Sequence, residues 1–336
     1  MTKVADVKRE PAPTQEAVAG GLLRQRFQQI LTFGSLIALM AFFSLANPNF
    51  LTWSNVSGIL LSTAVIGILA LGTTFVIITG GIDLSIGTGM TLASVMTAVL
   101  LVNLSVPLAI AVLGGIAFGG LMGFVNGFNV AVLRIPPFIA TLAMMLIAQG
   151  LALVLSGKAP IYFTGTPAFG AISRGFLVPG LRLPNAVLIL FLLTAVAAVI
   201  LGKTILGRYT FAIGSNEEAT NLSGINVRRW KIAIYTLAGA FTGIAGVVLA
   251  ARLNSAQPAL GLGYELQAIA AVVIGGTSLQ GGKGSVIGSI VGALIMGVLV
   301  NGLRIMSIPQ EWQTVVVGVV ILVAVYTDIL RRGKEG

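Results

Sequence analysis

The stretch "VSGILLSTAVIGILALGTTFVIIT" (56–79) contains no charged residue and ends at Gly80-Gly81. A run of roughly 20 apolar residues can cross the hydrocarbon core of a bilayer as a helix. Several other runs approach or exceed that length, and only 9% of the 336 residues are charged, against about 25% in soluble domains. The sequence therefore predicts an all-α fold, a polytopic bundle of transmembrane helices in a multi-pass membrane protein.

Prolines, glycines and polar residues divide the chain into about ten spans. The predicted helices cover residues 27–45, 56–79, 85–102, 107–134, 138–156, 185–201, 231–252, 264–279, 285–303 and 311–329. Two of them, 85–102 and 264–279, are short and are also compatible with broken or re-entrant helices. Residues 1–24 are polar and mixed in composition and are expected to form a disordered tail. Residues 25–332 then form the membrane domain, and 333–336 form a second tail.

Basic residues are distributed unequally between the two sides of this map. With both termini in the cytoplasm, 15 of the 20 Lys and Arg residues lie inside, in agreement with the positive-inside rule. The 203–230 loop is then cytoplasmic and the 157–184 loop external, and an odd number of spans would break the agreement. The basic residues expected outside are Lys158, Arg174, Arg182, Arg252 and Arg304.

The composition also excludes several classes of function. The net charge of +10 falls in short loops and tails, so topology explains it better than binding to nucleic acid. The chain has no cysteine and no histidine, which removes disulfides, zinc sites and imidazole catalysis. No carboxylate pair is evident on one helix face, so no enzyme activity and no metal or cofactor site is expected in this chain.

One segment superficially resembles a phosphate-binding loop. It reads "TSLQGGKGS" (277–285), and its lysine is Lys283. The motif needs a glycine six positions before the lysine and a hydroxyl residue directly after it. The chain has Thr277 and Gly284 at those positions. No nucleotide site is therefore predicted here.

Two glycine-rich stretches resemble each other. "VIITGGIDLSIGTGMTLASVM" (76–96) matches "AVVIGGTSLQGGKGSVIGSIVGAL" (271–294) when Gly80-Gly81 is set on Gly275-Gly276. In both, an apolar helix ends at Gly-Gly and a Gly/Ser-rich helix follows a polar turn. One interpretation is an internal parallel repeat, as in many transporters. The other is that glycine-rich helices look alike because they pack closely.

The polar segment "GRYTFAIGSNEEATNLSGINVRRWK" (207–231) interrupts the apolar chain. Ser215 lies three residues before Glu218, which is the spacing of a capping box. With Ser215 as N-cap, Glu217 falls in the first turn, where the helix dipole favours anions. Gly224 stands where such a helix would stop. The pattern predicts a short cytoplasmic helix of about eight residues, and a solvated connection without a helix is the alternative.

Polar residues inside the predicted spans are candidates for a translocation path. They are Asp83, Asn126, Asn129 and Gln149. The carboxylate of Asp83 could instead accept the free amides of the following helix. The amide side chains could equally bond one helix to another. Both interpretations stay open from the sequence.

Several motifs together resemble one known family. "GSNEEATNLSGINV" (214–227) is similar to the cytoplasmic coupling motif of permease subunits of ATP-binding-cassette sugar importers, the ribose-permease-like family. "TGGIDLSIG" (79–87), "GFVNGFNVAVLRIPPFIATLAMM" (123–145) and "VIGGTSLQGGKGSVIG" (273–288) resemble it in the same order. The resemblance covers about residues 30–330. Thr220 departs from it, because the family more often has a second alanine there.

This resemblance implies a permease subunit that translocates a monosaccharide (pentose, hexose or polyol) through a bacterial inner membrane. It implies four partners: a cytoplasmic ATPase subunit that binds ATP and Mg, an extracytoplasmic sugar-binding protein, a second permease subunit that forms a homodimer, and membrane lipid. By the same resemblance, the residues that couple the chain to the ATPase are Gly214, Ser215, Asn216, Glu217, Glu218, Ala219, Ser223, Gly224 and Ile225.

Other kinds of transporter remain as alternatives. Within the same class, the chain could import a nucleoside or a branched-chain amino acid. Outside it, a self-sufficient channel or secondary transporter would need no ATPase. Such proteins usually place ionisable residues in mid-helix, whereas the carboxylates here gather at predicted helix ends.

Overall fold

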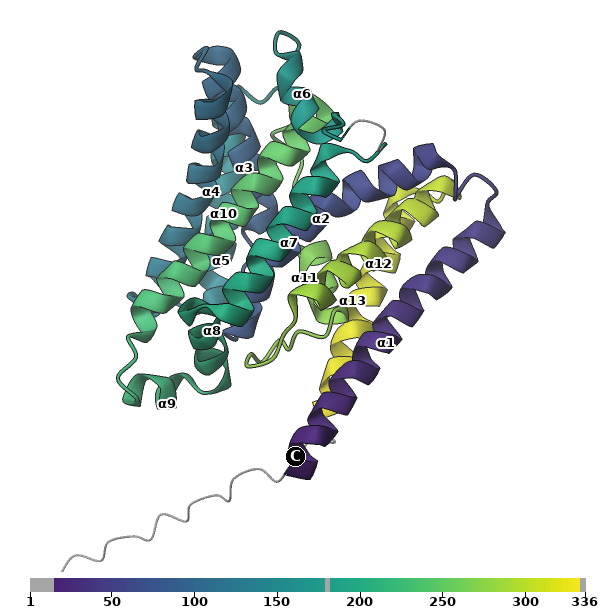
Figure 1. Ribbon diagram of the computed structural model, residues 1–336. Helices are drawn as coiled ribbons and strands as arrows, with labels where there is room; N and C mark the ends of the chain where they lie inside the picture. Colours follow the sequence, from purple (N-terminus) through teal and green to yellow (C-terminus); the bar gives the residue numbers. More distant parts are fainter. Residues whose placement is uncertain (1–14, 179–181, 333–336) are drawn as a thin grey trace, which may run out of the picture.

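The computed structural model describes residues 15–178 and 182–332 and is helical over most of that length (Figure 1). In chain order its elements are α1 (Gln15–Ala46), α2 (Trp53–Ile78), α3 (Ile86–Ala98) with a π-helical turn (Val99–Asn103), α4 (Leu108–Ala131), α5 (Pro137–Leu155), β1 (Ile161–Tyr162), α6 (Pro167–Arg174), α7 (Asn185–Lys203), α8 (Ile205–Ser215), α9 (Glu217–Leu222), α10 (Val227–Leu253), β2 (Ser255–Ala256), α11 (Tyr264–Ile274), α12 (Val286–Ile305) and α13 (Gln310–Arg332). Within these residues, 8 helices are long and apolar enough to cross a membrane. The predicted polytopic helical bundle is confirmed at this level.

The predicted spans correspond closely to observed helices, with two differences. α11 ends at Ile274 instead of near residue 279, so it has 11 residues and rises only about 16 Å. That is roughly half of a hydrocarbon core of about 30 Å. The helix α1 begins at Gln15, inside the stretch expected to be a disordered tail. The rest of that tail, residues 1–14, and the tail at 333–336 lie outside the described residues.

α2 occupies the centre of the bundle. It packs against α7, α10, α11 and α12, and side chains along its length such as Val65, Ile68 and Phe75 are completely buried. In α13, by contrast, no residue of the membrane-spanning window is buried inside the protein. Exposed apolar residues on such outer helices are expected where lipid tails replace water. The bundle therefore has a protein core around α2 and an apolar surface for the bilayer.

A seam of glycines joins α4 to α10. Gly115, Gly119, Gly123 and Gly127 follow one face of α4 at four-residue spacing. A Cβ atom added at Gly119 would clash with the backbone of Gly239 on α10. Small residues let transmembrane helices approach until their backbones touch. The seam fixes α4 directly against α10.

The two helices whose ends resemble each other in sequence end with the same backbone geometry. At the end of α2, the amide of Gly81 donates to Val76 O at 3.2 Å, and Gly80 has a φ of 77°. At the end of α11, the amide of Thr277 donates to Val272 O at 3.1 Å, and Gly276 has a φ of 92°. Both are Schellman motifs, in which glycine takes the left-handed conformation. The backbone therefore aligns Gly80 with Gly276, one residue away from the register predicted from the Gly-Gly pairs.

The loop at 157–184 is more ordered than its glycine and proline content indicates. β1 pairs antiparallel with β2, which follows α10, and Ile161 lies opposite Ala256. The short helix α6 then packs on α10 and α7. The rings of Phe163 and Phe169 lie 4.0 Å apart and are buried. This loop is thereby attached to α7, which follows it in the chain, and to α10.

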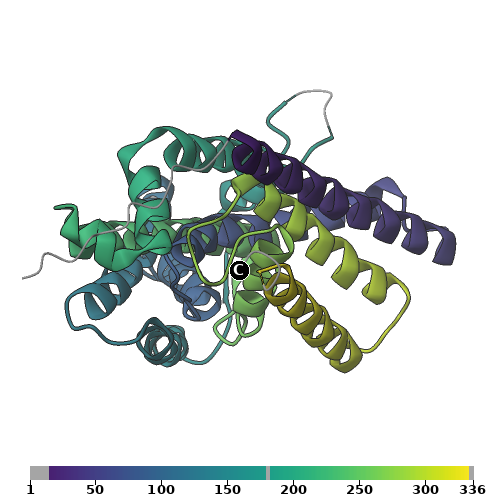
Figure 2. The ribbon, with the colours of Figure 1, turned by 90° about the horizontal axis from the view of Figure 1, so that it is seen from below.

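Helix α9 lies at one end of the molecule, away from α6. The described start of α1 and the end of α13 lie toward the same end as α9 (Figure 1). Seen from that end, α1, α12 and α13 group on one side, while α8, α9 and α10 lie on the other (Figure 2). The polar segment of the chain therefore projects from one end of the helix bundle.

Candidate coupling surface and buried polar cluster

The polar segment forms two helices instead of one. α8 runs from Ile205 to Ser215, and α9 runs from Glu217 to Leu222. The predicted N-cap, Ser215, is the last residue of α8, and Asn216 caps α9 in its place. Asn216 has an extended backbone, with a φ of −158°, and its Oδ1 accepts the amide of Ala219 at 2.9 Å. The prediction was wrong at this residue because the preceding chain continues as a helix up to Ser215.

The other end signals of α9 are where the sequence predicts them. Glu217 and Glu218 lie in the first turn, Ser223 is the C-cap, and Gly224 follows with a φ of 84°. Asn226 then caps α10, its Oδ1 accepting the amide of Arg229 at 3.1 Å. A helix of six residues is too short to be stable by itself. Its caps and its neighbours must therefore hold it in place.

One face of α9 packs inward and the other is exposed. Thr220 is buried, and its Oγ1 donates to the carbonyl of Asn216 at 2.7 Å. Leu222 on the outer side is 80% exposed. Near this helix, the rings of Tyr209 on α8 and Trp230 on α10 meet edge to face at 4.9 Å. α9 therefore exposes apolar and acidic side chains on its outer side, and packed side chains support its inner side.

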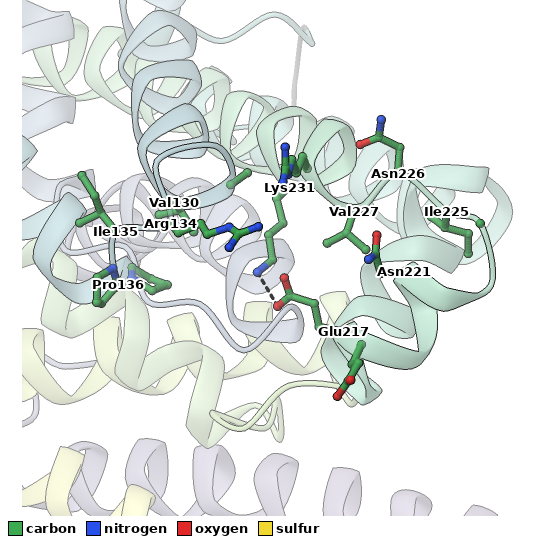
Figure 3. A pocket seen from close by; sticks show the side chains of 15 residues that line it. Val130, Arg134, Ile135, Pro136, Glu217, Asn221, Ile225, Asn226, Val227 and Lys231 are labelled. Atoms are coloured by element: carbon green, nitrogen blue, oxygen red, sulfur yellow. Dashed lines mark hydrogen bonds and ion pairs between the residues drawn. The ribbon is translucent and has the colours of Figure 1, made fainter.

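A groove of about 860 Å³ lies between α9, the start of α10 and the connection from α4 to α5 (Figure 3). Lys231 Nζ bonds Glu217 Oε2 at 2.6 Å across it. Since the Glu217 side chain is 54% exposed, this pair contributes only about 0.2–1 kcal/mol to stability. The groove is lined by Val130, Ala131, Arg134, Ile135, Pro136, Pro137, Glu217, Glu218, Asn221, Gly224, Ile225, Asn226, Val227, Arg228 and Lys231.

The structure brings most of the predicted coupling residues to this one surface. Glu217, Glu218, Gly224 and Ile225 line the groove. Ser215, Asn216, Ala219 and Ser223 are exposed on and beside α9. Gly214 differs, since it is half-buried in the last turn of α8. Arg134, Pro136 and Pro137 also line this groove. The sequence did not predict this contribution, because their loop lies far from α9 in the chain.

Asp83 and Asn126 meet in a buried polar cluster. Asp83 Oδ1 accepts the amide of Ser85 at 2.8 Å and its hydroxyl at 2.6 Å. Asn126 Nδ2 on α4 donates to Ser85 Oγ at 2.8 Å. All three residues are buried. The carboxylate thus accepts an amide at the start of α3, as one interpretation predicted, and Ser85 links it to α4.

One polar atom of this cluster and one on α10 have no hydrogen-bond partner among the described residues. They are Asn126 Oδ1 and the hydroxyl of Tyr235 on α10. Buried polar groups are nearly always paired, and these two are among six unpaired buried side-chain atoms in the described residues. Asn129 and Gln149 are half-buried, and within the described chain no hydrogen bond joins their side chains to the cluster. Of the four predicted path residues, Asp83 and Asn126 therefore belong to one bonded cluster, and Asn129 and Gln149 are not bonded to it.

Comparison with known families gives a match over most of the chain. Residues 55–325 match the family described as branched-chain amino acid transport system / permease component. The chain belongs to this family. It is accordingly a permease subunit of a transport system and not an enzyme.

Curated relatives cover nearly the full length of the chain. It is 44% identical to the ribose import permease protein of Escherichia coli strain K12, over 88% of this chain and 91% of the relative. It is 43% identical to the ribose import permease protein of Bacillus subtilis strain 168, over 90% and 92%. It is 35% identical to the xylose transport system permease protein of E. coli K12, over 94% and 95%. No solved structure matches.

Proposed function

We propose that this chain is the membrane subunit of an ATP-binding-cassette importer that carries a monosaccharide into the cytoplasm. The observation that carries the proposal is the 44% identity, over 88% of the chain, to a ribose import permease protein. α9 supports it independently, because a capped, exposed helix beside a groove provides a surface to which a partner protein can bind. In this proposal α9 and the groove seat a cytoplasmic ATPase that binds ATP and Mg.

The other partners follow from the same assignment. Two copies of the chain pair in a bacterial inner membrane, and an extracytoplasmic sugar-binding protein delivers the solute to the outer face. ATP binding closes the two ATPase subunits, and the residues from Gly214 to Ile225 transmit the movement. The exposed apolar face of α13 supports contact with lipid or with the second copy.

Ten passes with both termini in the cytoplasm fit the geometry. α11 is only half a span, but β2 before it pairs with β1 in the 157–184 loop. After α11, the amide of Gly282 donates to the carbonyl oxygen of Ile78 at 2.8 Å. Ile78 is the last residue of α2 and lies at the end of the bundle opposite to β2. The segment from β2 to Gly282 therefore runs the length of the bundle and acts as one pass. The matching ends of α2 and α11 support a parallel repeat of α2–α3 and α11–α12.

The path residues divide into two groups. Asp83 and Asn126 join the start of α3 to α4, which supports helix packing as their main role. Asn129 and Gln149 are half-buried with amide groups not engaged within the described chain. We assign these two as solute contacts, because an amide can bond a sugar hydroxyl as donor and acceptor.

The first experiment is purification of the tagged chain from its native membrane in mild detergent. Thr220→Pro removes the amide that donates to Asn216 O at 3.0 Å and should break α9. Thr220→Ala keeps that amide and is the matched control. An ATP-binding-cassette ATPase, identified by mass spectrometry, should accompany the native chain and the alanine variant but not the proline variant. Purification without an ATPase in all three cases would contradict the proposal.

Uptake assays then distinguish the substrates and the energy source. Cells carrying the chain should take up labelled ribose, xylose or fructose, and ATP depletion should stop the uptake. The family description favours a second candidate, a branched-chain amino acid, so labelled leucine is tested in parallel. Uptake that follows an ion gradient and persists without ATP would favour a secondary transporter instead.

A further inference from the structure

Three segments that are far apart in the sequence meet at Gly214, in the last turn of α8. A Cβ atom added at Gly214 would clash with the carbonyl oxygen of Ile78, the last residue of α2. The same atom would lie 2.6 Å from the amide nitrogen of Gly282, in the turn between α11 and α12. Only glycine allows this approach of three backbones. We call these residues, with Gly80 and Gly281, the glycine junction.

Backbone groups hold the three segments of the junction together. The amide of Gly282 donates to Ile78 O at 2.8 Å, which ties the turn to the end of α2. Gly80, Gly281 and Gly282 all have positive φ angles, of 77°, 88° and 74°. A Cβ added at Gly281 would lie 2.8 Å from Gly214 O and 2.9 Å from Gly80 N. Backbone atoms of the three segments are in direct contact. No segment can therefore slide past the others without breaking these contacts.

The junction is also close to α9, because a short connection with fixed hydrogen bonds joins α8 to α9. A single residue, Asn216, separates α8 from α9. Its amide donates to Ala212 O on α8 at 3.0 Å, and its side chain accepts from Ala219 on α9 at 2.9 Å. A displacement of α9 therefore moves the last turn of α8. That turn rests directly on α2, the central helix, and on the turn that begins α12.

We propose that the glycine junction is the relay that transmits movement of the ATPase from α9 to the membrane core, and that its three segments move as one body. Gly214 acts as a positioning residue: it makes no contact with ATPase or solute, but sets the distance between α8 and α2. Because α2 and the α11–α12 turn both meet α8 there, a single push reaches both elements. This inference rests on the proposed function of α9.

The first test widens the junction with Gly214→Ala. The matched control is Gly202→Ala near the end of α7, where a Cβ meets nothing within 4 Å. Each variant is reconstituted in proteoliposomes with its ATPase and sugar-binding protein. The assay sugar is whichever of ribose, xylose and fructose the native chain takes up fastest. A misplacement of about 1 Å can cost about a hundredfold in rate, so we expect Gly214→Ala to lose at least about tenfold in uptake.

Two further readouts separate a relay from a merely structural role. Gly214→Ala should retain the ATPase on purification, because Gly214 does not line the groove, yet lose the stimulation of ATP hydrolysis by the loaded binding protein. Normal uptake and normal stimulation in this variant would overturn the relay. If Thr220→Pro also retained the ATPase, the proposed function of α9 would fail instead, so the two failures are distinguishable.

The second test fixes the junction with a disulfide and does not depend on tolerance of Gly214→Ala. The chain has no cysteine, so Ser215→Cys with Gly282→Cys introduces a unique pair. A Cβ added at Gly282 would lie 3.2 Å from Ser215 Cα, so the two positions are adjacent in space. We expect the bond to form and uptake to remain within about twofold of the reduced protein, because one body loses no motion when fixed. Uptake that stops on oxidation and returns with a reductant would overturn the single body, as would failure of the bond to form while the single-cysteine variants fold.

Discussion

Asn216 shows how much a single side chain decides in this protein. Its extended backbone ends α8, and its carboxamide begins α9 one residue later. Asparagine is among the best N-cap residues because its short side chain reaches the free amides of the first turn. The exposed surface proposed to meet the ATPase is therefore oriented by one amide group.

Replacing Asn216 with alanine should cost α9 about 1 kcal/mol. The matched control is Ser215→Ala, which removes the side chain that the sequence predicted as the cap. Hydrogen exchange of the α9 amides, followed by mass spectrometry, should rise roughly fivefold in Asn216→Ala. It should stay unchanged in Ser215→Ala. The opposite pattern would restore Ser215 as the cap.

Asp83 illustrates a buried carboxylate whose partners are neutral. Within the described residues it makes no ion pair, and its Oδ1 accepts two bonds from Ser85. An amide and a hydroxyl left unpaired in the core each cost about 1–3 kcal/mol. The carboxylate is thus important for the local fold whether or not solute passes near it.

We expect Asp83→Ala to lower the thermal stability of the purified protein, because both Ser85 donors lose their acceptor. Asp83→Asn keeps an oxygen at the same position and should retain most of the stability. Unfolding in detergent, followed by intrinsic fluorescence, measures the difference. If both variants lost stability equally, the negative charge itself, and not the acceptor, would be what the site requires.

At the scale of elements, the approach of helices is governed by glycine. α4 and α10 touch along the seam at Gly119 and Gly123, and α11 meets α12 where Gly275 faces Gly288. Between lipid-facing helices there is no hydrophobic driving force, so close packing must supply the association. The glycine-rich composition of this chain is therefore a packing requirement more than a source of flexibility.

The seam predicts opposite results at two neighbouring glycines of α4. A Cβ at Gly119 clashes with Gly239 O and lies 2.6 Å from Gly243 Cα, whereas a Cβ at Gly120 meets nothing nearer than 4.0 Å. Gly119→Ala should destabilise the protein by about 1–3 kcal/mol, as overpacking does. Gly120→Ala should be tolerated. The yield of monodisperse protein on size exclusion after mild heating compares the two variants, and equal behaviour would contradict direct contact of the helices.

At the scale of the whole molecule, the bundle has two chemically different ends. One end carries α9 and the groove with Arg134, Arg228 and Lys231. The other carries α6 and the β1–β2 pair. The positive-inside rule assigns the first end to the cytoplasm. The proposed direction of transport and the sides occupied by the partners both depend on that assignment.

Cysteine labelling tests this topology without interference, since the native chain has no cysteine. Leu222 on α9 and Leu177 after α6 are 80% and 75% exposed. In intact cells, a membrane-impermeant maleimide should label Leu177→Cys and not Leu222→Cys. In inside-out vesicles the pattern should reverse. Labelling of both positions from the same side would require an even number of passes between them and would contradict this topology.

Much of this protein follows from the sequence alone, because the length of an apolar run is a local property. The positions of the spans, the polar segment with Glu217 and Glu218 in a first turn, and the stop at Gly224 needed no knowledge of distant residues. The sequence also predicted membership of the permease family, since the motifs of that family are short and occur in order.

Only the tertiary structure decided the features that depend on which distant segments meet. These are the half-length of α11, the link from Asp83 through Ser85 to Asn126, and the glycine junction. At Gly214 the sequence shows only a glycine near a helix end. Its role comes from the carbonyl of Ile78 and the amide of Gly282, and backbone contacts between remote segments leave no local pattern in the residues that make them.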